Sequence, residues 1–386
     1  MTTVYLDHNA TTPLDPRVLE AMLPYLGGEF GNPSSVHAYG RAARAALDTA
    51  REQVAVLVNA QASQVVFTSG GTEANNLALR GAAAVLPVGR IAVSAIEHDS
   101  VRAPAKRLAR GGWQLDLVGV NRNGQVTPDT LRAAMQADTR LVSIMLANNE
   151  SGVVQDIASL AGQARSNGAI VHTDAVQAAG KIAVDFSVCG AHLMSVSAHK
   201  LYGPKGVGAL IVDKTLELQS LVNGGSQERG IRPGTENVAG IVGFGAAAEI
   251  AQVELQDGAM RQAALRDHLE AALRAVSGLV IFGSDAVRVP NTLQISVAGI
   301  EGETLLMQLD RAGFAVSSGS ACAAGHNDPS PVLIAMGVAP VVARGALRIS
   351  LGRRTTRQEV DEFARVFRDC VAQLRCSIER PTPAPV

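Results

Sequence analysis

The chain has 386 residues, of which 47% are hydrophobic and 18% are charged, and its formal net charge is -1. This length predicts two or three structural units at about 150 residues each, and the composition is that of a globular protein with a large interior. The near-zero net charge excludes a basic field that would attract nucleic acid or an anionic membrane, so we expect neither as a partner.

The N-terminal residues 1–8 have neither a basic start nor an apolar run, so the sequence predicts no signal peptide. The sequence has no stretch of about 18 apolar residues free of charges and turn signals, so we expect no membrane-spanning helix. The four cysteines, Cys189, Cys322, Cys370 and Cys376, lack the Cys-x-x-Cys spacing of zinc sites. We therefore expect a cytoplasmic protein with free thiols and no intrinsic metal site.

Short apolar runs alternate with alanine-rich segments of helical length along the first 255 or so residues. This pattern predicts an α/β domain, in which a mainly parallel sheet is covered by helices on both faces. The runs that we expect to be strands are 64–68, 90–94, 141–145, 170–173 and 207–212.

The spacing changes after about residue 255. A helix is predicted over 261–276, followed by strands over 291–297 and 347–351 and by a final amphipathic helix that begins after Thr356-Arg-Gln-Glu359. These elements predict a second, smaller α+β domain. We expect the large domain at 16–255 and the small domain at 256–386, together with the N-terminal segment 1–15.

Cys322 lies in the small-residue stretch Val316-Ser-Ser-Gly-Ser-Ala-Cys-Ala-Ala-Gly-His326. A cysteine that serves packing normally has apolar neighbours, whereas Ser, Gly and Ala are typical of an exposed loop. The surroundings of Cys322 therefore favour a chemical role. Cys370 lies on or beside the apolar stripe of the last helix, where packing is the simpler interpretation, and nothing singles out Cys376.

Lys200 and Asp174 follow two neighbouring predicted strands. Lys200 ends Ser197-Ala-His-Lys200 before a Gly-Pro-Lys-Gly turn, and Asp174 ends the run that starts at Ile170. Either charge alone could be an ordinary solvated residue. Together they suit pyridoxal phosphate, because a lysine binds this cofactor as a Schiff base and a carboxylate keeps its ring nitrogen protonated.

The run Val65-Val-Phe-Thr-Ser-Gly-Gly-Thr72 predicts a strand, a Gly-Gly turn and a helix that begins near Thr72. Backbone N–H groups and a hydroxyl at a helix N-terminus can hold the cofactor's phosphate, although such turns are more often structural. His98 follows the strand 90–94 and could stack on the ring and carry protons, while a lone histidine is more often an ordinary loop residue.

The chain resembles the cysteine desulfurases of the class-V aminotransferase-like, fold-type I pyridoxal-phosphate enzymes, the type that serves nitrogen fixation and iron-sulfur cluster assembly. The matching motifs occur in order from near residue 5 to near residue 353, and Ser-Ser-Gly-Ser-Ala-Cys is the most specific of them. They lie at 5–13, 30–35, 68–76, 148–152, 172–177, 197–200, 232–236, 317–322 and 347–352.

The resemblance implies a role for each matching residue. Lys200 would be the Schiff-base lysine, Asp174 would pair with the ring nitrogen, and Gln177 would contact the ring hydroxyl. Asn149 and Arg348 would bind the substrate carboxylate, Arg348 by a bidentate fork. The residues implied for the phosphate are Gly71, Thr72, Ser197, His199 and, from the other subunit of a homodimer, Thr235, while His98 would stack on the ring.

The implied activity removes sulfur from L-cysteine and releases L-alanine. Cys322 would be the nucleophile that keeps the sulfur as a persulfide and passes it to an acceptor or an iron-sulfur scaffold protein, with transient contact to an iron-sulfur cluster as the one metal contact expected. The residues that follow Cys322 differ from those of many relatives, so the identity of the sulfur acceptor stays open. Selenocysteine lyase or aminotransferase activity on the same fold, or a non-catalytic sulfur-assembly scaffold, are the alternatives.

Overall fold

The computed structural model describes residues 3–318 and 328–378. Its largest element is a seven-stranded sheet in the order β2-β8-β7-β6-β5-β3-β4. Every neighbouring pair from β7 to β4 is parallel, whereas β8 is antiparallel to both β7 and β2. The strands are β2 (Val65–Thr68), β3 (Arg90–Ser94), β4 (Gln114–Val118), β5 (Thr139–Ser143), β6 (Ile170–Asp174), β7 (Leu193–Ser197) and β8 (Gly208–Val212).

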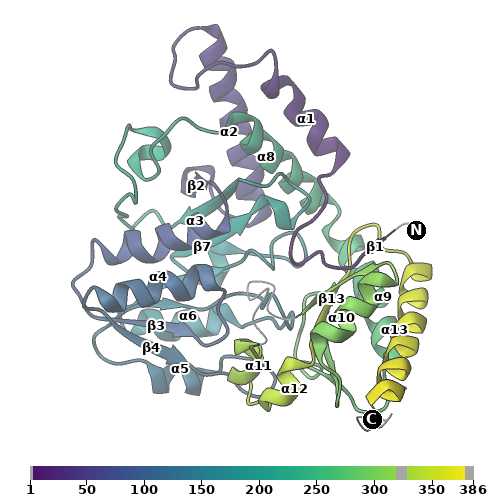
Figure 1. The fold of residues 1–386 in the computed structure, drawn as a ribbon. Helices are drawn as coiled ribbons and strands as arrows, with labels where there is room; N and C mark the ends of the chain where they lie inside the picture. The colour runs from purple at the N-terminus through teal and green to yellow at the C-terminus, as the bar shows by residue number, and fades with distance from the viewer. Residues whose placement is uncertain (1–2, 319–327, 379–386) are drawn as a thin grey trace, which may run out of the picture.

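Helices cover both faces of this large sheet (Figure 1). One face packs against α1 (Pro16–Leu26), α2 (Ala38–Leu57), α5 (Pro128–Ala134), α6 (Ile157–Ser166) and α8 (Val238–Val253). The other face packs against α3 (Gly71–Asn76), the π-helical turn η2 (Leu77–Gly81) and α4 (Asp99–Arg110). The central strands β6, β7 and β8 are buried along nearly their whole length, as expected for strands with helices on both sides.

A second sheet has four strands in the order β12-β13-β10-β9. These are β9 (Leu279–Ile281), β10 (Thr292–Val297), β12 (Ser317–Ser318) and β13 (Ala346–Ser350), all antiparallel to their neighbours. Its own apolar core contains residues of α9 (Leu255–Leu273), α10 (Gly302–Arg311) and α13 (Arg357–Ile378). The short helices α11 (Pro331–Ala335) and α12 (Pro340–Arg344) lie between this small sheet and the large one.

The N-terminal segment belongs to the small sheet's side of the molecule, where Figure 1 shows both chain ends. Strand β1 (Val4–Tyr5) pairs in parallel with β11 (Phe314–Ala315). The segment then runs on toward the large sheet, where the backbone N–H of Thr12 donates to the carbonyl of His199. The first twelve residues therefore connect the two sheets.

Most predicted elements are present with small shifts. The strand expected over 141–145 is β5, which starts two residues earlier and ends at Ser143, and the helix expected over 261–276 is α9, which starts at Leu255. The capping box before the last helix is confirmed: the backbone N–H of Thr356 donates to Glu359 at 2.7 Å, and that of Glu359 donates to Thr356 at 3.2 Å. Cys370 is buried in the small sheet's core, which confirms its packing role.

Within the described parts of the chain, no single helix is long and apolar enough to cross a membrane. One pair, α8 with α9, reaches that length and composition together but is bent by 71° at its junction. Residues 3–318 and 328–378 also contain no cluster of three or more His, Cys, Asp or Glu side chains that could hold a metal ion.

Candidate active site

A cavity of about 550 Å³ lies between the large sheet, the small sheet and the N-terminal segment. It is at the carboxyl ends of the parallel strands, where open α/β sheets bind their ligands. Its lining includes nearly all of the predicted site residues that the structure describes: Gly71, Thr72, His98, Asn149, Asp174, Gln177, Ser197, His199, Lys200 and Arg348.

Asp174 and Lys200 reach this cavity from adjacent strands. Asp174 is the last residue of β6 and is 5% exposed; its two oxygens accept hydrogen bonds from Asn75 Nδ2 at 2.7 Å and from the backbone N–H of Val176 at 2.9 Å. Lys200 ends the 3-10 turn η3 (Ala198–Lys200) after β7. Its amine donates to the backbone carbonyls of Asn9 at 2.5 Å and Ala10 at 2.7 Å. The N-terminal segment thus helps to hold Lys200.

The Gly70–Gly71 turn leads from β2 into α3, and Gly71 is the first residue of that helix. A Cβ atom on Gly71 would lie only 2.9 Å from Val176 Cγ2, so a larger residue would disturb the cavity wall. Across the turn, the hydroxyl of Ser197 is buried and has no hydrogen-bond partner among the described residues. A buried hydroxyl without a partner is costly, which indicates a missing ligand atom at this position.

His199 also lines the cavity and is next in the chain to Lys200. Its Nδ1 is 3.1 Å from the hydroxyl of Thr11. Burial lowers the pKa of His199 to about 4, with smaller contributions from Lys200 and Lys205. The imidazole is therefore neutral near pH 7, and its ring N–H can donate to an anion without adding a charge.

His98 is the N-cap residue of α4 and also lines the cavity. Its Nδ1 accepts the backbone N–H of Ser100 at 3.1 Å and lies 2.7 Å from the hydroxyl of Ser100. Because Nδ1 accepts from a backbone N–H, the neutral ring carries its proton on Nε2, on the ring edge away from the start of α4. Asn75 donates to the same Ser100 hydroxyl at 2.8 Å, so one amide connects Ser100 with Asp174.

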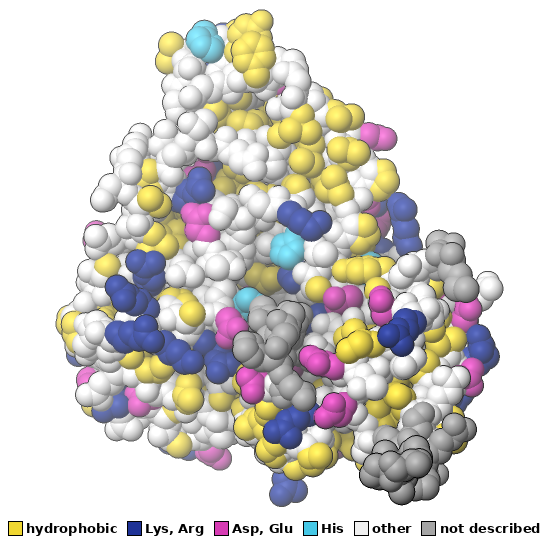
Figure 2. Space-filling view, viewed as in Figure 1, with side chains coloured by type: hydrophobic (Ala, Val, Ile, Leu, Met, Phe, Trp, Pro, Cys, Tyr) yellow, Lys and Arg dark blue, Asp and Glu magenta, His cyan; other side chains and the backbone are white. Residues whose placement is uncertain are grey.

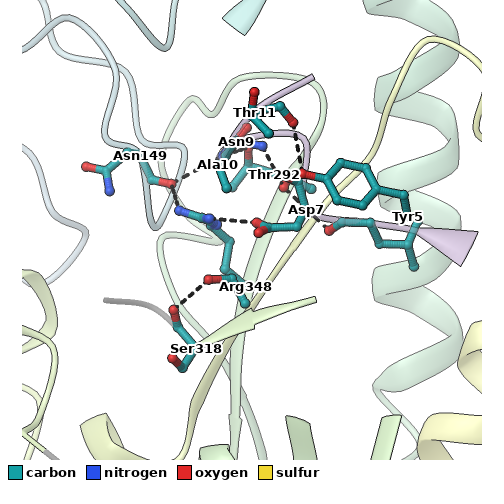
Figure 3. Close-up of polar contacts among 12 residues, drawn as sticks. Tyr5, Asp7, Asn9, Ala10, Thr11, Asn149, Thr292, Ser318 and Arg348 are labelled. Carbon is teal, nitrogen blue, oxygen red and sulfur yellow. Dashed lines mark hydrogen bonds and ion pairs between the residues drawn. The ribbon is translucent and has the colours of Figure 1, made fainter. Parts of the chain in front are cut away.

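Arg348 comes from β13 of the small sheet and is only 2% exposed. Figure 3 shows its guanidinium between the N-terminal segment and Asn149. It donates to Asp7 Oδ1 at 2.7 Å and to the backbone carbonyl of Asn149 at 3.0 Å, while Nε has no partner within the described residues. The side-chain amide of Asn149 points away from Arg348 in the same view. A buried arginine with one unused N–H at a cavity wall can bind a carboxylate.

Two glutamates also line the cavity, and the sequence analysis did not assign them. Burial raises the pKa of Glu97 to about 8 and that of Glu150 to about 7. Glu97 accepts hydrogen bonds through Oε1 from Ser94 and from the backbone N–H of Met145, whereas its Oε2 has no partner among the described atoms. Both carboxyls can hold a proton near neutral pH.

Thr235 does not line the cavity. Thr235 is exposed, in the loop after the 3-10 turn η4 (Gln227–Gly230). Arg232 in that loop forms an ion pair with Glu73 of α3 at 2.9 Å, which connects the loop to the helix at the Gly-Gly turn. Cys322 lies outside the described residues; the chain resumes with Asp328, which lines the cavity.

The family model of the class-V aminotransferases matches residues 4–363. The cysteine desulfurase IscS of Dictyoglomus turgidum is 43% identical over 375 residues, 96% of this chain and 95% of that one. The cysteine desulfurase IscS of Anaeromyxobacter sp. strain Fw109-5 is 47% identical over 378 residues, 96% of this chain and 93% of that one. The chain belongs to the cysteine desulfurases.

Solved structures agree with this family. A structure described as a NifS-like protein matches with a TM-score of 0.90 and 38% identity over 96% of this desulfurase and all of that chain. A NifS-like protein from Rickettsia africae has a TM-score of 0.87 and 33% identity, over 96% of this chain and 99% of that one. These matches confirm the predicted fold class, a fold-type I α/β enzyme.

Pyridoxal phosphate is the cofactor of this desulfurase family, and the cavity fits it. A lysine and a carboxylate lie in one cavity, the hydroxyl of Ser197 needs a partner, and Gly71 keeps the wall close without a side chain. The volume of about 550 Å³ is within the usual range of cofactor sites. The residues that could hold the phosphate and the ring therefore surround one space.

Several side chains in and behind this desulfurase's cavity have no clear signature in the sequence. Asp7 and Asn9 lie in the motif at 5–13, which did not assign them a role. Glu97 directly precedes His98 and was not assigned a role either. Lys181 is seven residues after Asp174 in an otherwise apolar and small-residue stretch. The sequence signal for Lys181 is a single charge inside the apolar and small-residue run 178–184, because charged residues are rarely buried unless they are paired.

Figure 2 shows lysine and arginine side chains gathered to one side of the cavity region, over α4. This helix carries Arg102, Lys106, Arg107 and Arg110, and Arg80 of η2 lies near Arg107 around a neighbouring hollow. The described surface is thus locally basic here, although the whole chain has a net charge of -1.

Proposed function

We propose that this protein converts L-cysteine to L-alanine and transfers the sulfur atom to Cys322 as a persulfide. The observation that carries the proposal is the meeting of Lys200, Asp174 and the buried Arg348 at one cavity. A lysine and an acid suit the cofactor, and an arginine suits the carboxylate of an amino acid substrate.

Bound pyridoxal phosphate supplies an electron sink for bond cleavage in the substrate. Lys200 would bind the cofactor covalently, and Asp174 would hold the proton on its ring nitrogen. Gln177 would contact the ring hydroxyl, and His98 would stack on the ring. Gly71, Thr72, Ser197 and His199 would hold the phosphate, since all four line the cavity and the Ser197 hydroxyl has no partner among the described residues.

Arg348 and Asn149 would position the substrate through its carboxylate. Nε of Arg348 is unused among the described residues, and Nη2 is held by Asp7. A bidentate contact with the substrate carboxylate would therefore use Nε together with one of the two Nη atoms. Asp7 would keep its hydrogen bond with Nη2 and hold the guanidinium in place, or it would release that bond to the substrate. Asp7 also limits how the guanidinium can turn, which orients the substrate.

Cys322 would act as the sulfur acceptor on the protein. Its thiolate forms an S–S bond with the sulfur of the substrate while the C–S bond breaks, and the carbon fragment takes up a proton and leaves as alanine. The support is the small-residue sequence around Cys322 and its place between Ser318 and Asp328, since both ends of that segment are near the site: Ser318 pairs in β12 with β13, and Asp328 lines the cavity.

We further propose a cytoplasmic homodimer with two domains per subunit, at 16–255 and at 256–386 with 1–15. The separate apolar cores of the two sheets and the pairing of β1 with β11 support this division. The exposed position of Thr235 is suited to contact with the partner's phosphate. A sulfur acceptor or iron-sulfur scaffold protein would take the persulfide, and the basic surface over α4 favours an acidic partner.

The test separates cofactor chemistry from sulfur transfer. The purified protein should be yellow and release alanine from L-cysteine, and Lys200→Ala should abolish release. Cys322→Ser should still bind L-cysteine and change the cofactor's absorbance, but it should carry no persulfide, as measured by sulfur labelling and peptide mass spectrometry. A label on Cys189, Cys370 or Cys376 of the wild type would show that the nucleophile is another residue.

The same assays distinguish the alternatives. A selenocysteine lyase would release alanine much faster from selenocysteine than from cysteine, and an aminotransferase would aminate a 2-oxo acid. A non-catalytic scaffold would release no alanine from either substrate while it still bound a sulfur-pathway partner.

A further inference from the structure

Lys181 is a buried lysine without a counter-ion behind the cavity. It is only 8% exposed, and within residues 3–318 and 328–378 no carboxylate forms an ion pair with it. Burial, followed by the neighbouring positive charges of Lys200 and Arg348, lowers the pKa of its amine. Burying an unpaired amine is costly, so its position calls for a specific use.

The amine of Lys181 has two described partners, both side-chain amide oxygens. It donates to Gln177 Oε1 at 2.6 Å and to Asn9 Oδ1 at 2.8 Å. In both contacts the amine is the donor, so the oxygen end of each amide faces it. Lys181 therefore favours one orientation of each amide, together with the donor contacts that Gln177 Nε2 makes to the Asn9 carbonyl and that Asn9 Nδ2 makes to Thr292.

The consequence for Gln177 is that its NH₂ group must point the other way. That group donates to the backbone carbonyl of Asn9 at 3.0 Å and belongs to a side chain that lines the cavity. The same carbonyl accepts from Lys200. The backbone carbonyl of Asn9 thus accepts hydrogen bonds from both Gln177 and Lys200. Lys181 in turn donates to the side-chain oxygens of Gln177 and Asn9.

We propose that Lys181 is a positioning residue, which locks the amide of Gln177 so that its N–H donors, and not its oxygen, face the cofactor. This inference rests on the proposed function, in which Gln177 contacts the ring hydroxyl. An N–H donor stabilises an ionised ring oxygen, whereas an amide oxygen at the same place would repel it. Lys181 touches neither substrate nor cofactor and acts through Gln177.

The test compares the absorbance of cofactor-loaded full-length variants at one pH. The form with an ionised ring oxygen absorbs at longer wavelength than the form with a neutral hydroxyl. Lys181→Met keeps the length and burial of the side chain but removes the donor, so the ratio of long- to short-wavelength bands should fall by about threefold to tenfold, the worth of one hydrogen bond. Lys214→Met, which changes an exposed lysine after β8, is the matched control and should leave the ratio unchanged.

A double-mutant cycle shows whether Lys181 acts through Gln177. In a Gln177→Ala background, Lys181→Met should cause no further fall in the band ratio. A fall of equal size in that background would overturn the proposal. So would an unchanged ratio in Lys181→Met with a lowered melting temperature, because that pair of results describes a role in stability alone.

Lys181→Gln covers the case in which Lys181→Met does not fold. Its amide N–H keeps one donor in reach of Gln177, so its ratio should lie between those of the wild type and Gln177→Ala, and a ratio equal to that of Gln177→Ala would count against the proposal. A wild type without a long-wavelength band, or Lys200→Ala that retains it, would contradict the proposed cofactor chemistry instead.

Discussion

The pKa values of two glutamates in this cavity depend on burial more than on their neighbours in sequence. Glu97 and Glu150 are both buried at its wall, and burial raises the pKa of each carboxyl. Asp174, which also lines the cavity, accepts hydrogen bonds from the Asn75 amide and from the backbone N–H of Val176. The three acids at one cavity thus lie in two kinds of environment, which prepares the two glutamates and Asp174 for different roles.

Glu97→Gln should make the protein more stable at pH 8 and change its stability little at pH 5. The pKa of Glu97 is raised from about 4.5 in the unfolded chain to about 8 in the fold. The wild type therefore has the full benefit of the bound proton below about pH 4.5 and loses about 1.4 kcal/mol per pH unit between 4.5 and 8. Glutamine has no such loss, so the difference in unfolding free energy between variant and wild type should grow across this window.

Urea unfolding at several pH values measures this difference. Glu29→Gln is the control, because Glu29 is exposed after α1 and its replacement should give no such trend. A difference that is constant from pH 5 to pH 8 would mean that Glu97 does not keep its proton in the fold.

The residues that the sequence predicted are those whose chemistry has a short local signature. Lys200 and Asp174 follow two consecutive strands, so their motifs alone brought them together. Lys181 and Glu97 could not be assigned in this way, because whether a charge is buried depends on contacts made from distant parts of the chain. Lys181, for example, reaches Asn9, which is 172 residues away.

At the scale of elements, strands and helices were predictable because their periodicity and caps are local. The exception is instructive: Ile144 and Met145 were expected in a strand, but β5 ends at Ser143. Both residues are buried, and the backbone N–H of Met145 donates to Glu97 instead of to a neighbouring strand. An apolar sequence shows that a segment is buried, but it cannot show where its hydrogen bonds go.

The start of α3 gives a prediction at this scale. Gly71→Ala should weaken cofactor binding by roughly tenfold to a hundredfold, because its Cβ would lie 2.9 Å from Val176 and force the turn or the wall to move. Dialysis of the cofactor from the variant, followed by absorbance titration, measures the change in the dissociation constant.

Gly258→Ala in α9 is the matched control. No atom lies within 4 Å of a Cβ at that position, so the change should stabilise the helix by about 0.5–1 kcal/mol and leave cofactor affinity unchanged. Equal cofactor affinity in both variants would mean that the close approach at Gly71 has no part in binding.

At the scale of the whole molecule, a further prediction concerns a dimer of two copies of the chain. If Thr235 contacts the phosphate in the partner's site, Thr235→Asp should weaken cofactor binding there, whereas Lys200→Ala inactivates its own subunit. A heterodimer of the two variants then has one site with both defects and one with neither. It should recover up to about half of wild-type activity, as expected for two-fold symmetry.

Co-expression with two different tags allows the heterodimer to be purified and assayed. A wild-type heterodimer that carries the same tags is the control. If the mixed heterodimer is as inactive as its parents while the control is active, Thr235 does not act across subunits.

The place of Asn9 has a consequence for how the chain folds during synthesis. Its backbone N–H donates to Ser350, 341 residues further on, and its side chain donates to Thr292. At about 5–20 residues per second, the first segment leaves the ribosome tens of seconds before these partners exist. The large sheet can form meanwhile, whereas the contacts of Asn9 with Thr292 and Ser350 must wait until β10 and β13 have emerged. Asn9 thus completes its native contacts long after it has been synthesised.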